Sequence, residues 1–179
     1  MSCNAIGTIS LECLDSIGGL ETIYYIQKSK VTAINLDTAT NTITGITLSA
    51  TGNTNKFQEI QVNENSSSWV ETNQFNLENG SQGWEIALTI VFSKSDALSR
   101  SVINQLVKTK CYVIVKNNDG RYFFIGYRNG GYFNGGDYGS GKALSDRNGY
   151  QLVFTSFEAA TAYEVSSTII SALILEATV

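Results

Sequence analysis

The sequence has no proline, no histidine and only three cysteines among its 179 residues. Without histidine, the chain lacks the usual general base and the usual partner of a catalytic thiol. No Cys-x-x-Cys pair is present, so neither a zinc site nor a disulfide scaffold is expected. Cys111 opens an apolar run and is predicted to be a small core residue. Without proline, loop stiffness must come from glycine turns, side-chain hydrogen bonds or assembly contacts.

Positive charge is also scarce. Twelve Lys and Arg stand against 16 Asp and Glu, which gives a net charge of -4 and a pI near 4.8. Proteins that grip nucleic acid through many phosphate contacts concentrate Lys and Arg, so a surface of that kind is not expected. An acidic chain of this type suits ordinary solubility, and it also suits a protein that DNA must pass without sticking.

Long hydrophobic runs are missing at both ends. Residues 1–5 do not lead from a basic region into an apolar run, so we expect neither a signal peptide nor a lipoprotein leader. Residues 168–179 are apolar, but the run is too short and too interrupted to span a bilayer. The length and the 42% hydrophobic content fit a single domain over residues 1–179.

Most of the chain has the residue pattern of β-strands. The clearest strand is predicted over residues 84–92, where apolar and polar side chains alternate with the period of two of a half-buried strand. A tight turn at residues 117–120 indicates a hairpin between two of the other strands. The other strands are expected at residues 21–27, 30–36, 42–49, 57–62, 69–77, 111–116, 121–128 and 150–157.

One amphipathic helix is predicted over residues 96–110. Apolar residues fall on one broad face, Asp96 lies near the positive end, and Lys108 and Lys110 lie near the negative end. The residues expected to bury this helix against the sheet are Leu98, Val102 and Leu106. The predicted fold class is therefore mostly β, a β-sandwich or partial barrel with one flanking α-helix.

A long glycine-rich loop is expected at residues 129–149. The run is too long for a tight turn and too poor in aliphatic residues for core. Loops of this length inside compact domains are often functional. Its aromatic residues, Tyr132, Phe133 and Tyr138, are predicted to contact an adjacent subunit.

No catalytic, cofactor-binding or metal-binding residues are assigned. Residues 136–143 nearly match a phosphate-binding loop that ends in Lys142, but Ala143 replaces the hydroxyl that would bind magnesium. Asp137, Asp146 and Glu158 are read as solvated turn residues, because nothing in their spacing brings two of them to one face. We therefore expect no enzyme and no cofactor, and measurable nucleotide turnover would be the sign of one.

Aromatic residues on β-structure leave an alternative open, a carbohydrate- or host-surface-binding module. Rings on one face of a sheet could form a platform on which sugars stack. The candidates for such a platform are Tyr24, Tyr25, Trp69, Trp84, Tyr122 and Tyr132.

Several short motifs occur in an order that carries a family resemblance. These are SLEC at residues 10–13, GGLETIY at 18–24, the helix at 96–110, DGRYFFIG at 119–126 and GYQLVF at 149–154. In this order the chain resembles tail-tube-like and neck-ring (head–tail connector) proteins of bacteriophages, most closely those of crAss-like phages. The similarity extends over most of the chain.

The resemblance implies a virion structural protein of the phage neck or tail, assembled in the host cytoplasm. Identical subunits would form a ring of six or twelve copies, in contact with an adjacent ring, portal or tail proteins. Genomic DNA would pass through the lumen without specific binding, and no membrane is implied. Closing a sheet around such a ring would remove the unpaired edges that an open sheet exposes.

Overall fold

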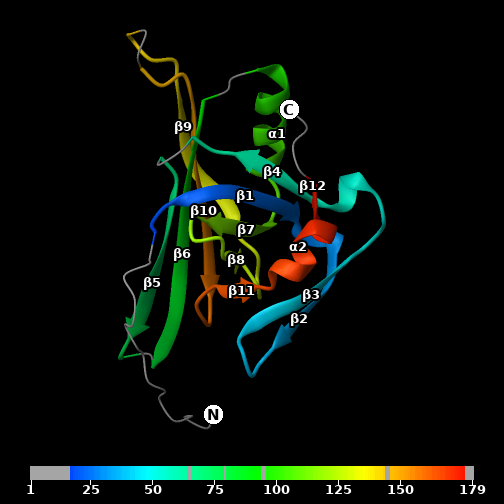
Figure 1. Cartoon of the computed structure of the whole chain (residues 1–179). Helices are drawn as coiled ribbons and strands as arrows, with labels where there is room; N and C mark the ends of the chain where they lie inside the picture. The colour runs from blue at the N-terminus through cyan, green and yellow to red at the C-terminus, as the bar shows by residue number, and fades with distance from the viewer. Residues whose placement is uncertain (1–16, 64–65, 79, 94–95, 144–145, 176–179) are drawn as a thin grey trace.

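The fold consists of two β-sheets that share a core, with two short α-helices beside them (Figure 1). The computed structural model describes residues 17–63, 66–78, 80–93, 96–143 and 146–175. The predicted class, a mostly-β sandwich or partial barrel with a flanking helix, is confirmed.

The larger sheet has eight strands in the order β12-β4-β1-β7-β8-β11-β3-β2. Its pairs are antiparallel except β11 with β3 and β12 with β4, which are parallel. The strands are β1 (Leu20–Gln27), β2 (Val31–Asp37), β3 (Thr42–Leu48), β4 (Phe57–Gln61), β7 (Cys111–Asn117), β8 (Tyr122–Ile125), β11 (Tyr163–Val165) and β12 (Ile174–Leu175). Two short 3-10 helices, Lys28–Lys30 and Asn53–Asn55, interrupt the chain between them.

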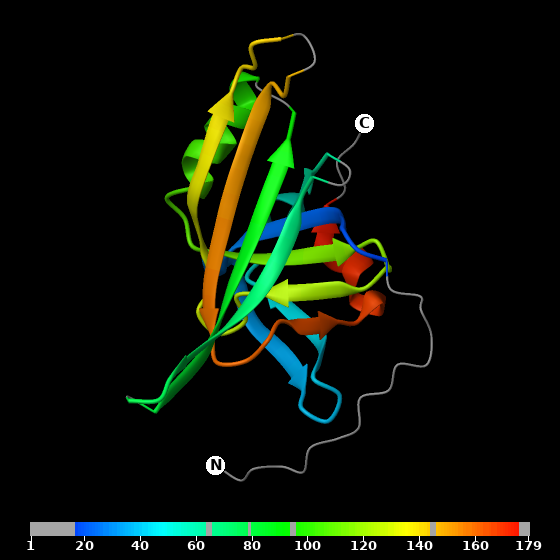
Figure 2. The same cartoon turned by 90° about the vertical axis from the view of Figure 1, so that its left-hand side faces the viewer.

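The smaller sheet has four antiparallel strands in the order β5-β6-β10-β9. They are β5 (Ser68–Asn76), β6 (Ser81–Phe92), β9 (Tyr132–Gly139) and β10 (Gly149–Glu158). Figure 2 shows these long strands standing across the end of the larger sheet. The two sheets meet face to face through a core whose fully buried members include Ile86, Leu88, Phe154, Val113 and Val115.

The larger sheet is covered on its other face as well. Phe57, Ile114 and Phe124 are fully buried there, and helix α2 (Ser167–Leu173) packs on them through Ile170 and Leu173. Because both faces of β7 are covered, its first five residues are all buried. This explains why β7 is a continuous apolar run rather than an alternating one.

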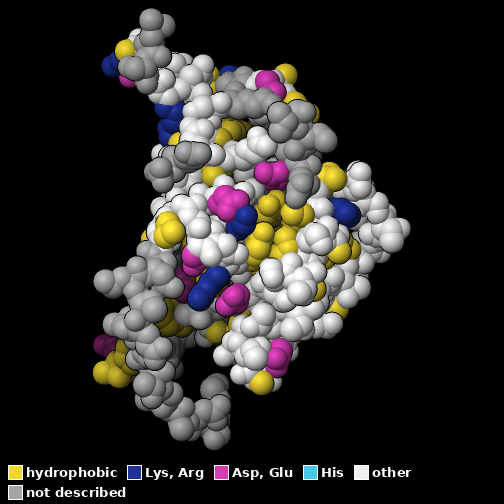
Figure 3. Space-filling model, in the orientation of Figure 1, with side chains coloured by type: hydrophobic (Ala, Val, Ile, Leu, Met, Phe, Trp, Pro, Cys, Tyr) yellow, Lys and Arg dark blue, Asp and Glu magenta, His cyan; other side chains and the backbone are white. Residues whose placement is uncertain are grey.

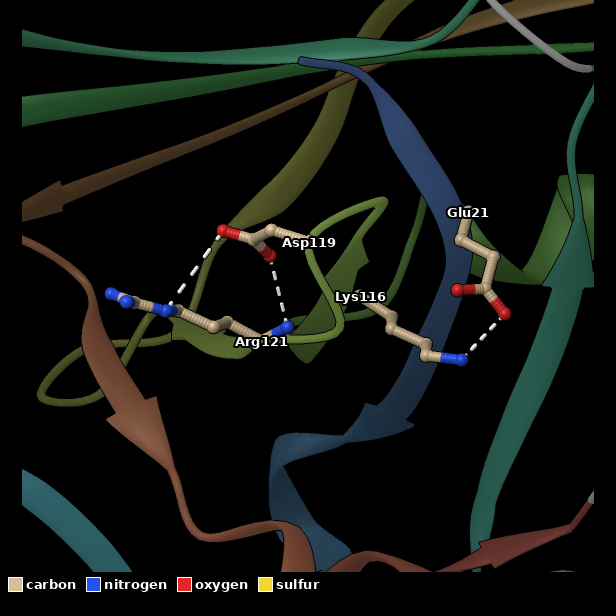
Figure 4. Close-up of polar contacts among 4 residues, drawn as sticks. All are labelled: Glu21, Lys116, Asp119 and Arg121. Atoms are coloured by element: carbon tan, nitrogen blue, oxygen red, sulfur yellow. Dashed lines mark hydrogen bonds and ion pairs between the residues drawn. The ribbon is translucent and has the colours of Figure 1, made fainter. Parts of the chain in front are cut away.

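The predicted hairpin of β7 and β8 is confirmed, and side chains hold its turn. The Asp119 carboxylate accepts a hydrogen bond from the Arg121 backbone N–H at 2.9 Å (Figure 4). Beside it, the Lys116 ammonium pairs with Glu21 of the neighbouring strand β1 at 2.5 Å. The hydrogen bond from Lys116 to Glu21 raises the pKa of the lysine. Both side chains are partly exposed, so this pair contributes at most about 1 kcal/mol.

Helix α1 (Ala97–Leu106) confirms the predicted helix, but not every predicted packing residue. Asp96 caps it by accepting from the Ser99 backbone N–H at 2.8 Å. Leu106 is buried and Val102 packs partly on the core, as predicted. Leu98, however, is 72% exposed, so the prediction for this residue is wrong. The first helical turn borders a groove beside β4 instead of covering core, and periodicity does not reveal where the underlying sheet ends.

Two further differences concern elements that the sequence pattern did not predict. Helix α2 is only seven residues long, which is too short to show a helical period. Residues 132–139, expected within a loop, form the edge strand β9. Gly136 explains the loop-like composition, because a Cβ there would lie 2.2 Å from the Gln151 carbonyl oxygen of β10. The glycine is required by a close approach between strands rather than by a loop.

Candidate assembly and channel surface

The four strands of the smaller sheet contain no lysine or arginine. They carry four acids instead, Glu71, Glu85, Asp137 and Glu158. Of the Lys and Arg residues that the structure describes, only Lys116 of β7 lies in the larger sheet, and the others lie in α1, in the first 3-10 helix or in connecting segments. Figure 3 shows positive and negative side chains close together over the larger sheet. The strands of the smaller sheet are therefore without cations, as are all strands of the larger sheet except β7.

One face of this sheet is turned away from the core. Ile86, Leu88 and Ile90 are buried between the sheets, so the alternate side chains of β6 point outward. The outward positions on the three strands β5, β6 and β10 are mostly small or polar: Val70, Thr72, Glu85, Ala87, Thr89, Gln151, Val153 and Thr155. Polar contacts order some of them, such as the hydrogen bond from Gln74 to Glu85 at 2.9 Å. The result is a mostly small and polar face, on which Phe157 is the large exposed apolar side chain and Arg147 pairs with Asp137.

Both edges of the smaller sheet lack a strand partner. Strands β5 and β9 have no further strand partner within the described parts of the chain. Exposed edges are often blocked by lysine, proline or a bulge; neither lysine nor proline occurs in β5 or β9, and β9 has one bulge, opposite Val153 and Phe154. Exposed apolar side chains lie on them instead, Val70 and Phe75 on β5 and Tyr132 and Tyr138 on β9. Such edges can accept another strand.

The two edges are also staggered and run in opposite directions. Strand β5 pairs with β6 from Ser81 to Thr89. Strand β9 begins at Tyr132, which pairs with Thr155 of β10, and Thr155 pairs with Ala87 of β6. From that level β9 runs toward the Phe92 end of β6, whereas β5 extends toward the Ser81 end. With four antiparallel strands, the outermost two must be antiparallel to each other. Stagger of this kind is what a sheet needs in order to close into a barrel.

The structure separates the three aromatic residues predicted to contact another subunit. Tyr132 and Tyr138 lie on the edge strand β9, each beneath a cation: Lys110 Nζ is 5.3 Å from the first ring and Arg100 Cζ is 5.1 Å from the second. Phe133 is only 2% exposed and packs on Phe154, with ring centroids 5.1 Å apart. Phe133 is therefore a core residue and cannot contact another subunit without leaving the core.

An exposed apolar group at the end of the β5–β6 hairpin was missed by sequence reasoning. Phe75 is 64% exposed and Leu77 is 81% exposed, beside the exposed Glu78. Figure 1 shows this hairpin reaching beyond the rest of the molecule at the lower left. The available signal was two large apolar residues in an otherwise polar stretch, but alternation alone assigned them to an ordinary strand.

The resemblance of residues 136–143 to a phosphate-binding loop does not extend to the geometry. Residues 136–139 belong to strand β9. The backbone N–H groups of Lys142 and Ala143 both donate to the Asp146 carboxylate at 2.8 Å, and these hydrogen bonds lower the pKa of Asp146. A phosphate would find these donors already occupied by a carboxylate.

The other two candidate acids are not free turn residues either. Asp137 pairs with Arg147 at 3.2 Å. Glu158 is buried rather than solvated, and it accepts from the backbone N–H groups of Arg128 and Asn129 at 3.1 and 3.3 Å. It thereby holds the turn that leads into β9. No group of three His, Cys, Asp or Glu that could bind a metal is present among the described residues.

The aromatic candidates for a sugar platform do not gather on one face. Trp69 joins the two sheets, since its indole N–H donates to Asn117 Oδ1 at 3.0 Å and its ring lies 5.3 Å from Phe123. Tyr24 and Tyr25 are neighbours on β1 and therefore point to opposite faces.

Known proteins offer no further guide to this surface. Comparison of the chain with protein-family models, with curated proteins and with solved structures found no match. No described helix is long and apolar enough to cross a membrane. We therefore infer function from the geometry of the smaller sheet and from the motif resemblance.

Proposed function

We propose that this chain is a virion structural protein that forms a homo-oligomeric ring of a phage neck or tail tube. The observation that carries the proposal is the smaller sheet, whose two edges lack a strand partner among the described residues and are staggered and opposite in direction. Its strands contain no lysine or arginine. The resemblance adds the expected setting, a virion with rings of six or twelve copies beside another ring, a portal or tail proteins.

The ring forms when β9 of one copy pairs with β5 of the next. A rotation about an axis roughly along the strands preserves strand direction, so the two edges meet antiparallel, like every other pair in this sheet. An odd number of strands would have given a parallel junction. Closure satisfies the backbone groups of both edges of the smaller sheet, so neither edge remains available for aggregation.

The outward face of the smaller sheet then lines the channel. Its central part presents Glu85, Thr89 and Gln151, and the guanidinium of Arg147 on this face is paired with Asp137 and donates to Gln151. Proteins hold DNA through contacts between Lys or Arg and phosphates, so a wall whose arginine is already paired with a carboxylate holds a duplex weakly. The lumen is thus suited to genome passage without specific binding.

Blocking one edge tests the proposal. Val70→Lys places a charge on the exposed edge strand β5, the device by which natural edges avoid pairing. We expect the wild-type chain to form rings in native mass spectrometry and the variant to shift to monomers while keeping its β-sheet circular dichroism. Thr38→Lys, in the exposed turn between β2 and β3, is the matched control and should leave the rings intact. A wild-type chain that stays monomeric at all concentrations and binds glycans would favour the alternative of a surface-binding module.

A further inference from the structure

A basic cluster lies beneath the start of β9, although the chain as a whole is acidic. It consists of Lys28, Lys110 and Arg128, gathered around the turn that leads into β9. The Lys28 backbone N–H donates to the Lys110 carbonyl at 2.9 Å, and Lys28 Nζ donates to the Arg128 carbonyl at 3.2 Å. A Cβ built on Gly130 would lie 3.3 Å from both lysine side chains. These contacts bring the side chains of Lys28 and Lys110 together beside the backbone of Arg128.

The cluster is not neutralised by acids that the structure describes. None of its three side chains forms an ion pair with a carboxylate among the described residues. Glu158 is the acid at this turn, but it is buried and accepts hydrogen bonds from backbone N–H groups. Apolar surface borders the cations, since Tyr132 lies beneath Lys110 and Val107 is exposed nearby in the chain. The surface combines positive charge with apolar contact area.

The end of the β5–β6 hairpin complements the basic cluster, because it combines a negative charge with apolar side chains. Phe75 and Leu77 supply exposed apolar side chains. Glu78 is exposed, its backbone N–H donates to Asn76 at 3.0 Å, and its carboxylate has no ion-pair partner among the described residues. The hairpin end therefore offers one negative charge beside two large apolar groups.

The stagger of the smaller sheet brings these two surfaces together in a ring. Within one copy, β9 starts level with Ala87, whereas β5 and β6 continue past it to Asn76 and Ser81. In a closed barrel the stagger repeats from strand to strand. The β5 strand of the neighbouring copy is then displaced in the same direction, and its hairpin end comes level with Tyr132, where the basic cluster lies.

On the basis of the proposed ring, we propose that the basic cluster receives the hairpin end of the neighbouring copy. Glu78 of that copy pairs with Lys28 and Lys110, while its Phe75 and Leu77 pack on Tyr132 and Val107. The contact fixes the register of the junction between β9 and β5. Glycine-rich edges specify register weakly, and β9 contains Gly135, Gly136 and Gly139. A charged contact at one end removes the ambiguity.

Cross-linking of mixed copies tests this contact directly. Unlabelled and nitrogen-15-labelled rings are dissociated, mixed, reassembled and treated with a carbodiimide, which joins carboxylates to lysines at zero length. We expect peptides that link Glu78 of one isotope to Lys28 or Lys110 of the other. If Glu78 cross-links only to other lysines, the proposed contact is wrong, whereas the proposed ring is unaffected.

Charge reversal with rescue provides an independent test. At low salt, Glu78→Lys and Lys110→Glu should each weaken ring association about tenfold, and the double variant should recover most of that loss. Glu164→Lys makes the same charge change as Glu78→Lys at an exposed position of the interior strand β11, and it should leave association unchanged. If the wild type forms rings and both reversals are silent, the contact is wrong although the ring is right. If the wild type forms no rings, both proposals fail.

Discussion

At the residue scale, contacts of single residues explain why the composition of residues 129–149 predicted a loop and resembled a phosphate site. The glycines of residues 129–149 suggest a loop, yet Gly136 is there because β10 approaches too closely for any Cβ. Asp146 occupies the backbone donors that make residues 136–143 resemble a phosphate site. Neither fact can be read from the sequence, because each depends on a contact with another segment of the chain.

Cys111 gives a prediction about pH. Burial raises the pKa of its thiol from the ordinary 9.0 to about 11. The unfolded chain therefore loses this proton first, and the contribution of Cys111 to stability is lost as the pH rises from about 9 to about 11. In a variant with Cys3→Ser and Cys13→Ser, we expect no reaction with a thiol reagent at pH 8 until denaturant is added. Rapid labelling of the folded protein would contradict the burial of Cys111.

At the element scale, the sequence predicts strands and helix α1 well, because each long element repeats its pattern over several residues. It does not predict how far one element extends over another. Leu98 and Leu106 share a helical face by periodicity, but only Leu106 lies over the core. Strand β9 and helix α2 were missed for a related reason, since an edge strand and a short helix bury too few residues to show a period.

The two leucines of α1 therefore predict unequal effects on stability. Leu106→Ala should lower the free energy of unfolding by about 2–5 kcal/mol, because it leaves a cavity in the core between the sheets. Leu98→Ala should change it by no more than about 0.5 kcal/mol, as expected for an exposed position. Urea denaturation of both variants under conditions where the chain is monomeric makes the comparison. Equal losses would mean that the first turn of α1 is packed after all.

At the scale of the whole molecule, we base the proposed ring on the four-stranded sheet. The acidic net charge favoured a surface that DNA passes without binding, which stays a prediction, and the four strands of this sheet contain no lysine or arginine. Which edges remain unpaired could not be foreseen, because strand order depends on long-range pairing such as β6 with β10. Tyr132 and Tyr138, predicted to contact an adjacent subunit, are exposed, and that contact stays a prediction; their place on an edge strand was not foreseen.

Electron cryomicroscopy of the purified, assembled chain would show directly which sheet surrounds the opening of the ring. We predict a closed ring with an open centre, in which β9 of each copy pairs antiparallel with β5 of the next and the Glu85 face lines the channel. A ring whose channel is formed by the eight-stranded sheet would contradict it. So would a monomer whose β5 and β9 edges are covered by other parts of the same chain.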